Sequence, residues 1–326
     1  MTTFIIRRLI ALIPVLLGVS TVVFFILHLT PGDPAQMMLG DFASRDAVEK
    51  LREEMGLNKP LYVQYGLFVA DIARGDLGRS ITQRQPVIKL IGQKLQATAE
   101  LAITAIIIAL ILGISAGIIA AVRRNGFVDY LVTLVSLIGV SAPVFYLGLL
   151  LILFFSLQLG IFPVSGRGGP LLPAIGDLFT GDAQPVIRSL RHLFLPALTL
   201  GLSFAALLAR MTRATMLEVL QQDFIRTARA KGLSIRFVTV KHALKNAGIP
   251  LLTIIGLQLS ALLGGSVLTE TVFAWPGLGR LAVDAIFARD FPLVQGTVLT
   301  VAVIFVLMNL IIDGLYGLID PRVTYS

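Results

Sequence analysis

The chain has 326 residues, of which 56% are hydrophobic and only 14% are charged, and its mean hydropathy is +0.87. Soluble domains are about 25% charged, so this composition excludes a soluble globular protein and indicates an integral membrane protein. The net charge of +8 fits basic loops beside a membrane better than nucleic-acid binding, because the basic residues are not interleaved with aromatic side chains; the absence of cysteine excludes disulfides and thiolate metal sites.

Six stretches without Asp, Glu, Lys or Arg are candidate membrane spans. A bilayer core about 30 Å thick requires roughly 20 apolar helical residues. The six stretches therefore predict transmembrane helices at Leu9–Leu29, Leu101–Val122, Leu131–Leu159, Leu193–Ala209, Ala247–Thr269 and Phe291–Ile312. The first follows Arg7 and Arg8 as a signal peptide would. The apolar stretch is too long for a signal peptide, and no cleavage site follows it, so we expect an uncleaved helix.

The segment 30–99 between the first two spans is polar and is predicted to be helical. Ser44 is a suitable N-cap for a helix that Gly56 would end. A second helix is expected over Leu61–Ile72, and a third from Pro86 toward the second span. This segment either covers the ends of the membrane helices or provides a docking surface for an external partner.

The third and fourth spans each contain a proline. Pro143 lies inside the long third span, where we expect a kink that can act as a hinge. The fourth span is the shortest, and Pro196 near its start is compatible with a proline in the first turn.

The short loops predict the orientation through the positive-inside rule. Arg7-Arg8 precede the first span, Arg123-Arg124 form the next inside loop, and the interval 210–246 holds eight basic residues against two acidic ones. The segment 30–99 carries nine basic and eight acidic residues, which nearly cancel. Long loops also obey the rule poorly. Six spans then place both termini in the cytoplasm.

Motifs for nucleotide binding and catalysis are missing from the sequence. It has no GxxxxGK[ST] phosphate loop, no HExxH and no GxSxG. The histidines His28, His192 and His242 are far apart, and the first two fall on the outer side, which leaves only an incidental zinc site open. No Asp or Glu lies in the middle of a span, whereas ion-coupled carriers usually keep such a group in the bilayer. We therefore expect a non-enzymatic pathway that another protein energises; an ion-coupled secondary transporter is the alternative.

The interval from Asp223 to Pro250 is the longest basic polar stretch between two apolar spans. Glu218–Lys231 are strong helix formers, Gly232 would end that helix, and Ser234 is a good N-cap for the next one. A helix, a turn and a second helix form a knob that can sit in a cleft of a cytoplasmic protein. The alternative is a solvated basic loop on an anionic leaflet.

This interval resembles the EAA motif of permease subunits of bacterial ABC importers. In that motif a Gly follows the EAA core after three residues, and a hydrophobic-x-Leu-Pro ending follows nine residues later. Aligned on Gly232, the core falls at Arg226-Thr227-Ala228 and the ending at His242-Ala243-Leu244-Lys245, so the initial acid and the final proline are missing. This departure, with RTARAKG and KHALKNAGIP, resembles the dipeptide/oligopeptide/nickel branch.

Motifs elsewhere in the chain resemble the same branch. They are LTPGDP at Leu29–Pro34, GDLG at Gly75–Gly78, RMTRATMLEVL at Arg210–Leu220, LTETVFAWPGLGR at Leu268–Arg280 and the terminal Asp320-Pro321-Arg322. They extend from the first span to the end of the chain, and their order resembles the B-type permease subunit.

The resemblance implies an all-α fold of the type I ABC importer permease class in a prokaryotic inner membrane. The implied partners are a second homologous permease, one or two kinds of cytoplasmic ABC ATPase, an extracytoplasmic solute-binding protein and the lipid bilayer, with no nucleic acid. The chain itself would hold no cofactor or metal, since ATP and Mg would be bound by the ATPases. The domains expected are 1–29, 30–99 and 100–326, with a cytoplasmic coupling loop at 210–249.

The resemblance also assigns ATPase coupling to the loop around Gly232. The coupling residues it implies are Asp223, Arg226, Thr227, Ala228, Arg229, Ala230, Lys231, Gly232 and His242. As alternatives, Gly232 can be a plain helix stop, and the basic side chains can face lipid headgroups.

Four further positions are candidates for a gate or for the pore: Glu270, Gly264, Gly265 and Pro143. Glu270 can face a peptide amine, or it can be a satisfied buried group in a turn with Trp275 as an interface anchor. Gly264 and Gly265 are expected to allow close helix packing. Within this family we expect di- or oligopeptides as substrates, with glutathione or a nickel complex as alternatives.

Overall fold

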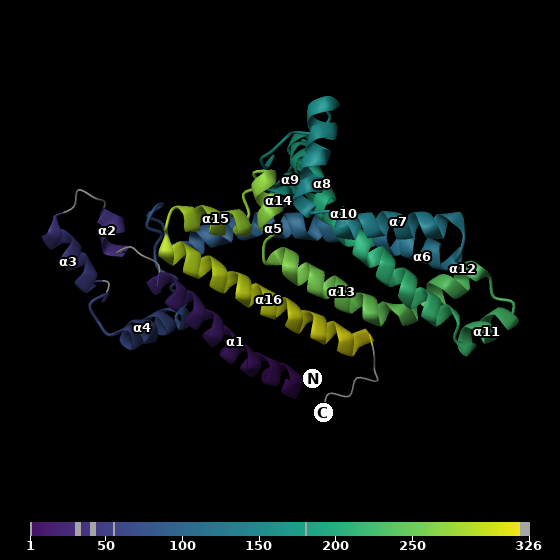
Figure 1. The fold of residues 1–326 in the computed structure, drawn as a ribbon, viewed down its shortest axis with the longest axis horizontal. Coiled ribbons are helices and arrows are strands. Elements are labelled where there is room, and N and C mark those ends of the chain that lie inside the picture. Colours follow the sequence, from purple (N-terminus) through teal and green to yellow (C-terminus); the bar gives the residue numbers. More distant parts are fainter. Residues whose placement is uncertain (1, 30–33, 40–43, 55, 180, 320–326) are drawn as a thin grey trace.

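The computed structural model describes residues 2–29, 34–39, 44–54, 56–179 and 181–319, and all regular elements in this part of the chain are helices (Figure 1). The α-helices are α1 (Thr2–Leu29), α2 (Pro34–Leu39), α3 (Arg45–Glu54), α4 (Leu61–Ala73), α5 (Val87–Ala109), α6 (Ser115–Val122), α7 (Phe127–Ser141), α8 (Val144–Leu151), α9 (Leu171–Leu178), α10 (Gln184–Leu220), α11 (Asp223–Ala230), α12 (Ile235–Phe237), α13 (Lys245–Leu263), α14 (Val267–Val272), α15 (Leu278–Phe287) and α16 (Phe291–Ile319). Short π-helical segments at Leu110–Ile114, Ile152–Gln158 and Val238–Leu244 continue α5, α8 and α12. The all-α prediction is confirmed.

Among the described residues, four helical stretches are long and apolar enough to cross a membrane. They are Val87–Val122, Gln184–Leu220, Ile235–Leu263 and Phe291–Ile312, and a bent pair formed by Phe127–Ser141 and Val144–Gln158 makes a fifth candidate. These stretches overlap the second to sixth predicted spans, although the fifth ends before its predicted limit. The first predicted span lies in α1, where the apolar helix found among the described residues is the shorter Ile13–Phe25.

The fourth and fifth spans differ from their predictions. The fourth, predicted to be the shortest, lies in the longest helix, because polar residues at both ends extend α10 to 37 residues, about 55 Å. The fifth does not continue to Thr269: α13 ends at Leu263, the backbone turns at Gly265 with φ of 103°, and α14 starts separately.

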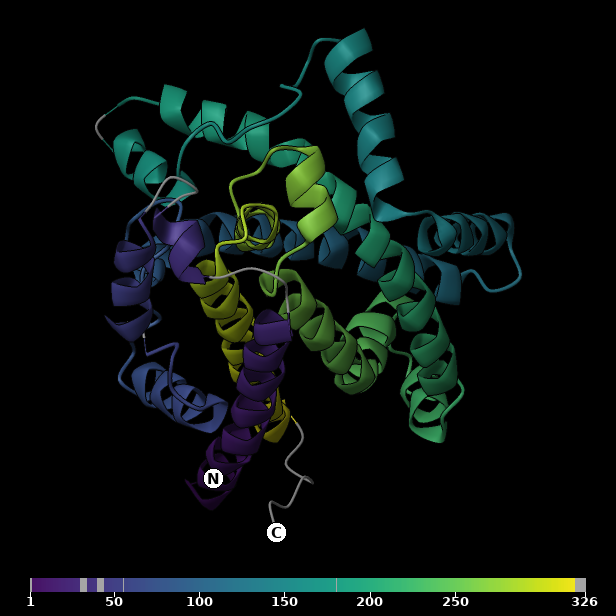
Figure 2. The same cartoon turned by 60° about the vertical axis from the view of Figure 1, so that its left-hand side comes forward.

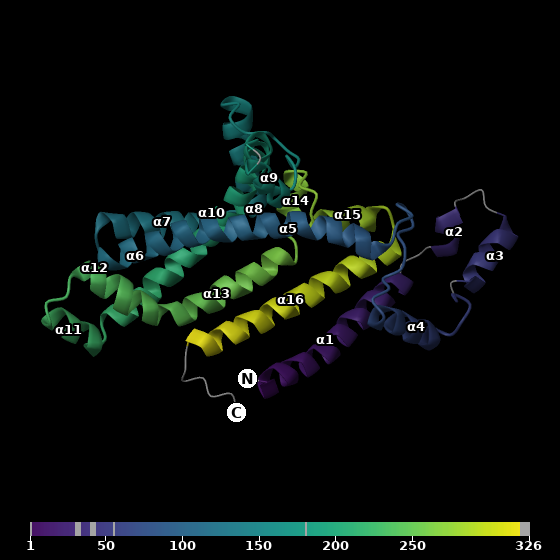
Figure 3. The same ribbon diagram turned by 180° about the vertical axis from the view of Figure 1, so that it is seen from behind.

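The third span bends at Pro143, and the bend is much sharper than the kink that the sequence predicts. α7 and α8 meet at 105°, so α8 stands away from the long helices in Figures 1 and 3. The residue before a proline is disfavoured in helical geometry, and Ala142 is accordingly extended, with ψ of 131°. Pro143 is extended as well, with φ of −60° and ψ of 130°, and α8 starts at the next residue.

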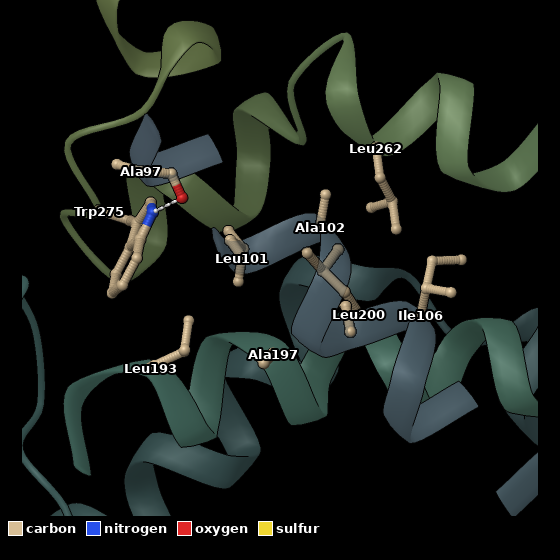
Figure 4. Packing of buried hydrophobic residues seen from close by; sticks show 10 residues of the cluster. Ala97, Leu101, Ala102, Ile106, Leu193, Ala197, Leu200, Leu262 and Trp275 are labelled. Atoms are coloured by element: carbon tan, nitrogen blue, oxygen red, sulfur yellow. Dashed lines mark hydrogen bonds between the residues drawn. The ribbon is translucent and has the colours of Figure 1, made fainter. Parts of the chain in front are cut away.

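α10 is the centre of the bundle and packs against α5, α6, α7, α8, α9 and α13. α13 packs on α16, and α16 packs on α1, which lies beside it in Figure 2 (purple beside yellow). Figure 4 shows the core between α5, α10 and α13, where Trp275 is 1% exposed and its Nε1 donates a hydrogen bond to the Ala97 carbonyl over 2.8 Å. Alanines on the facing helices allow the close approach, as small residues do in membrane bundles.

The segment predicted to be helical before the second span contains α3 and α4. The Ala47 amide donates to Ser44 Oγ over 3.3 Å, which confirms the N-cap, and Gly56 has φ of 68° just after α3. α4 extends one residue beyond its prediction, and α5 starts immediately after Pro86 and continues into the second span. The start of α1 and the end of α16 are the ends of these helices that point toward the α11–α12 region, and α2 to α4 lie at the opposite end of the molecule (Figures 1 and 3).

Candidate functional site

The candidate coupling element is α11, a helix of eight residues between α10 and α13. The prediction of one continuous helix over Glu218–Lys231 is wrong, because α10 ends at Leu220 and Gln222 is extended, with ψ of 153°. A new helix starts at Asp223, whose acid lies in the first turn, where it interacts favourably with the helix dipole.

Gly232 ends α11 in a turn that depends on its left-handed conformation. Its φ is 78°, and its amide donates to the Arg229 carbonyl over 2.9 Å while the Leu233 amide reaches the Ala228 carbonyl at 3.4 Å. These two bonds are the Schellman arrangement, in which glycine is the preferred residue. Nothing lies within 4 Å of the position that a Cβ would occupy on Gly232, so the turn is open to its surroundings.

One face of α11 is anchored in the body of the protein. Ile225 is fully buried and Ala228 is 8% exposed, and both belong to a cluster that we call the coupling cluster. Its buried members are Ala121, Met216, Val219, Ile225, Ala228, Val238, Ala243 and Ala247. Since these residues come from α6, α10, α11, the π-helical segment and α13, α11 is packed directly against elements of two long apolar helices.

The other face of α11 carries apolar and charged groups that point to solvent. Phe224 is 39% exposed, and Asp223 and Arg226 form only a loose pair at 3.5 Å, with side chains 95% and 77% exposed. Arg229 and Lys231 are exposed as well, as are Thr227 and Ala230. Of the predicted coupling residues in α11, only Ala228 is buried, and it holds the helix in place.

The turn after Gly232 positions His242. Ser234 Oγ accepts a hydrogen bond from the Phe237 amide at 3.4 Å, which confirms the predicted N-cap. The rings of Phe237 and His242 pack edge to face, with their centres 5.7 Å apart. Lys241 Nζ lies 4.8 Å from the centre of the Phe237 ring. His242 therefore packs within this second helical segment, whose exposed side adds Leu233, Ile235 and Val240 to the apolar groups of α11.

Glu270 is fully buried beneath the turn that holds Trp275. Its carboxylate accepts hydrogen bonds from Thr98 Oγ1 and from the Arg280 amide, both at 2.9 Å. A Cβ on Gly277 would collide with this carboxylate, so glycine is required there for the turn to close. This geometry fits the alternative of a satisfied buried group; the gate role of Glu270 stays a prediction.

The remaining pore candidates lie at helix ends. A Cβ on Gly265 would lie 3.0 Å from the Gly279 amide nitrogen, and one on Gly264 would lie 3.3 Å from Val301 Cγ1, so this pair permits close approach of α15 and α16 to the end of α13. Pro143 lies at the bend between α7 and α8. No group of three or more His, Asp or Glu residues could hold a metal among the described residues, and the side chain of His28 lies outside them.

Sequence reasoning missed three buried carboxylates that join distant segments. Asp129 at the start of α7 forms a two-pronged ion pair with Arg213 of α10, and Glu100 of α5 pairs with Arg167 at 2.6 Å. The third, Asp290, is fully buried and accepts from Ser80 Oγ at 2.5 Å and from the amide and hydroxyl of Thr82 at 3.0 and 2.8 Å. Their only sequence signal is a single acid beside an apolar span.

The pKa of Asp290 reflects two opposed influences. Burial raises the pKa of this carboxyl, but the hydrogen bonds from Ser80 and Thr82 outweigh burial and leave it below its ordinary value. The carboxylate also caps α16, because its Oδ1 accepts from the Leu293 amide at 3.3 Å. Asp290 thus fixes the 80–86 turn to the start of α16.

Two family descriptions match most of the chain. Residues 113–325 match the family "Binding-protein-dependent transport system inner membrane component", and residues 1–102 match the corresponding N-terminal family.

Curated relatives match over the full length of both chains. The chain is 48% identical to the dipeptide transport system permease protein of Alkalihalophilus pseudofirmus and 46% identical to the di/tripeptide transport system permease protein of Pseudomonas aeruginosa. It is 43% identical to the glutathione transport system permease protein of Escherichia coli. Each alignment covers 100% of this chain and 100% of the relative.

A solved structure shares the fold. The inward-facing MetNI methionine ABC transporter matches with a TM-score of 0.55 at 22% identity, over 72% of this chain and 97% of that chain. At this identity the likeness concerns the arrangement of helices alone.

Proposed function

The chain belongs to the family of binding-protein-dependent transport system inner membrane components, and on that premise we propose that it forms half of the pore of an ATP-driven importer of short peptides. The family makes it the membrane permease of a binding-protein-dependent ABC importer, a multi-pass protein of the inner membrane without catalytic function of its own. The ion-coupled secondary carrier that the sequence left open is thereby excluded.

Short peptides are the substrate class that the relatives support. Two of them are named for dipeptides or tripeptides, and the third for glutathione, which is itself a tripeptide. A di- or tripeptide delivered by an extracytoplasmic binding protein is therefore the proposed cargo.

The proposed topology has six spans, with both termini in the cytoplasm and the segment 30–99 outside. α1 and the bent α7–α8 pair add two spans to the four continuous ones. The arrangement of the ends supports this count, since the start of α1 and the end of α16 are the ends of these helices that point toward α11 (Figure 1). The proposed domains are accordingly 1–29, 30–99 and 100–326.

We assign coupling to α11 and Gly232. The observation that carries this assignment is a helix with one face locked into the coupling cluster and the other face exposing Phe224 and the charges of Asp223, Arg226 and Arg229. Such a helix can enter a cleft on a cytoplasmic ATPase, of one or two kinds, that binds ATP and Mg. A second, homologous permease would complete the pore.

Transport then requires α11 to pass ATPase closure to α10 and α13. Because the coupling cluster joins these helices without a flexible linker, α11 moves with them as a rigid body. A switch between inward-facing and outward-facing states needs a difference in binding free energy of a few kcal/mol between the two states. The exposed face of α11 would provide it through contacts that the ATPase makes in only one state.

Substitution of Gly232 tests this assignment. Asn adopts left-handed geometry more readily than other non-glycine residues, and the open space around Gly232 admits its small side chain. We expect Gly232→Asn to retain uptake of a labelled dipeptide and Gly232→Trp to reduce it at least about tenfold, which corresponds to about 1.4 kcal/mol, with both variants present in the membrane in equal amounts. Equal uptake by the two variants would contradict an ATPase contact at Gly232.

A further inference from the structure

An apolar groove lies between α7 and α10, apart from the coupling element. It has a volume of about 440 Å³, and its walls come from α6, α7, α8 and α10 and from the π-helical segment after α5. Val135, Gly139 and Ala142 line it from α7, and Ala206 and Ala209 line it from α10. The two helices touch at its floor, where a Cβ on Gly139 would lie 2.7 Å from Ala206 Cβ. Ser136 provides the only polar side chain among the lining residues.

The groove has the length of one lipid leaflet. On α7 its lining runs from Leu131 to Ala142, eleven residues apart, or about 16 Å at 1.5 Å per residue. Half of a hydrocarbon core about 30 Å thick is about 15 Å. A helix of that length, about 10 Å across, occupies on the order of 1,200 Å³ and cannot enter this volume. A single extended acyl chain can.

Basic side chains gather at one end of the groove. The ion pair of Asp129 and Arg213 closes that end, where each charge has its partner. Arg210 follows Ala206 by one helical turn on the same face of α10; it is exposed, and no ion pair to it is found among the described residues. Arg123 and Arg124, exposed in the loop before α7, add positive charge at the same end.

We propose that this groove binds one acyl chain of an anionic phospholipid from the cytoplasmic leaflet, with the lipid phosphate on Arg210 and the loop arginines. The inference rests on the proposed orientation, which places the α6–α7 loop in the cytoplasm. The apolar walls bury the methylene groups, and the unpaired guanidinium of Arg210 selects a negative headgroup. The lipid thereby lies along the seam between the bent α7–α8 pair and the central helix.

Lipid retention by the assembled importer tests the apolar half of the site. The purified complex would be stripped of lipid, incubated with phosphatidylglycerol carrying 16-carbon chains, and examined by native mass spectrometry. Val135 and Leu134 are neighbours on α7 and are 58% and 55% exposed, but only Val135 lines the groove. We expect one retained lipid per chain in the wild type and in Leu134→Trp, and at least about tenfold weaker retention in Val135→Trp, where the indole fills the groove.

The headgroup half is tested at Arg210. Preference for phosphatidylglycerol over phosphatidylcholine is expected to fall about fivefold in Arg210→Gln and to persist in Arg210→Lys, which keeps the charge. Glycerol phosphate and dihexanoyl phosphatidylglycerol should fail to displace the long-chain lipid; displacement by either would show that the headgroup alone binds and would overturn the acyl-chain site.

Two other results would overturn the proposal. One is equal retention by Val135→Trp and Leu134→Trp. The other is quantitative cross-linking of a cysteine at Val135 to the second permease, which would show that protein covers the groove. Dipeptide uptake and ATPase association, measured on the same preparations, separate this outcome from a failure of the proposed function: a complex that assembles and transports but retains no lipid refutes only the lipid site.

Discussion

Buried carboxylates hold together segments that the chain order separates widely. Glu100 and Arg167 are 67 residues apart, Asp129 and Arg213 are 84 apart, and Asp290 and Ser80 are 210 apart. A buried acid of this kind is costly when it loses its partners, because its charge or its polar atoms are then left without hydrogen bonds. These contacts therefore fix the positions of the helices relative to one another.

Removal of the Asp290 carboxylate should free the 80–86 turn from α16. In Asp290→Ala, the hydroxyls of Ser80 and Thr82 and the Thr82 amide lose their acceptor, which costs about 1–3 kcal/mol. Hydrogen exchange of the amides in this turn should accelerate about five- to hundredfold, since 1.4 kcal/mol is a factor of ten. Asp284→Ala, which removes only a surface pair with Arg280 at 3.7 Å, is the control and should leave exchange unchanged.

The pH dependence of the same contact has a definite sign. The folded pKa of Asp290 is lower than its ordinary value of 3.8, so its stabilising contribution is complete above pH 3.8 and is lost as the pH falls through the folded pKa. Exchange in the turn, corrected for the intrinsic pH effect, should stay constant from pH 8 to about pH 4 and rise only below it. A rise between pH 5 and 7 would show that another group controls the turn.

These residue pairs could not be predicted from the sequence. A periodic pattern reveals which face of a helix is apolar, but a single acid such as Asp129 has no preferred partner until the helices are packed. By contrast, Ser44, Gly56 and Ser234 act through atoms within a few residues, and their predicted roles as caps or stops were confirmed. Contacts between residues close in the sequence could be predicted from it, whereas ion pairs between distant segments could not.

At the scale of elements, α11 offers two faces that can be tested separately. Ile225 faces the coupling cluster and Phe224 faces solvent. Truncation of the fully buried Ile225 to Ala should cost about 2–5 kcal/mol of local stability and detach α11 from α10, so that peptide uptake falls more than ATP hydrolysis does. Uptake and hydrolysis measured on one reconstituted complex give this ratio.

Phe224→Ala is the matched variant on the opposite face. It removes an apolar side chain that is 39% exposed, so the melting temperature of the isolated chain should change little while the ATPase subunits dissociate more readily. If instead Phe224→Ala melts earlier and Ile225→Ala retains its stability, the inner and outer faces of α11 have been assigned the wrong way round.

The existence of the elements was more predictable than their ends. Apolar runs predicted the second, fourth, fifth and sixth spans correctly as helices, and the bend expected at Pro143 is present, but its angle of 105°, the end of α13 at Leu263 and the break at Gln222 were not predicted. For the bend and the end of α13 the cause is the same: hydropathy reports that a segment is buried in an apolar phase and says nothing of its direction. Direction depends on packing, here of α14 and α8 on α10.

For the whole molecule, the absence of cysteine makes the proposed topology directly testable. Single cysteines at Gln83 and at Arg229, both exposed, should be labelled from opposite sides of the membrane in intact cells. A membrane-impermeant maleimide should modify Gln83→Cys at once, and Arg229→Cys only after permeabilisation. Labelling of Arg229→Cys from outside, with Gln83→Cys labelled only after permeabilisation, would reverse the orientation and place α11 away from any cytoplasmic ATPase.

The right-angled turn at Pro143 has a consequence for the membrane itself. Because α8 turns aside, only the 15 residues of α7, about 22 Å, lie along the direction of the long helices, against a hydrocarbon thickness of about 30 Å. A span that is too short is accommodated by thinning of the adjacent bilayer, at a fraction of a kcal/mol for each ångström of mismatch. We therefore expect the bilayer to be thinner beside α7 than beside a helix as long as the 37-residue α10, so that the thickness of the host bilayer affects this transporter without any contact with its substrate.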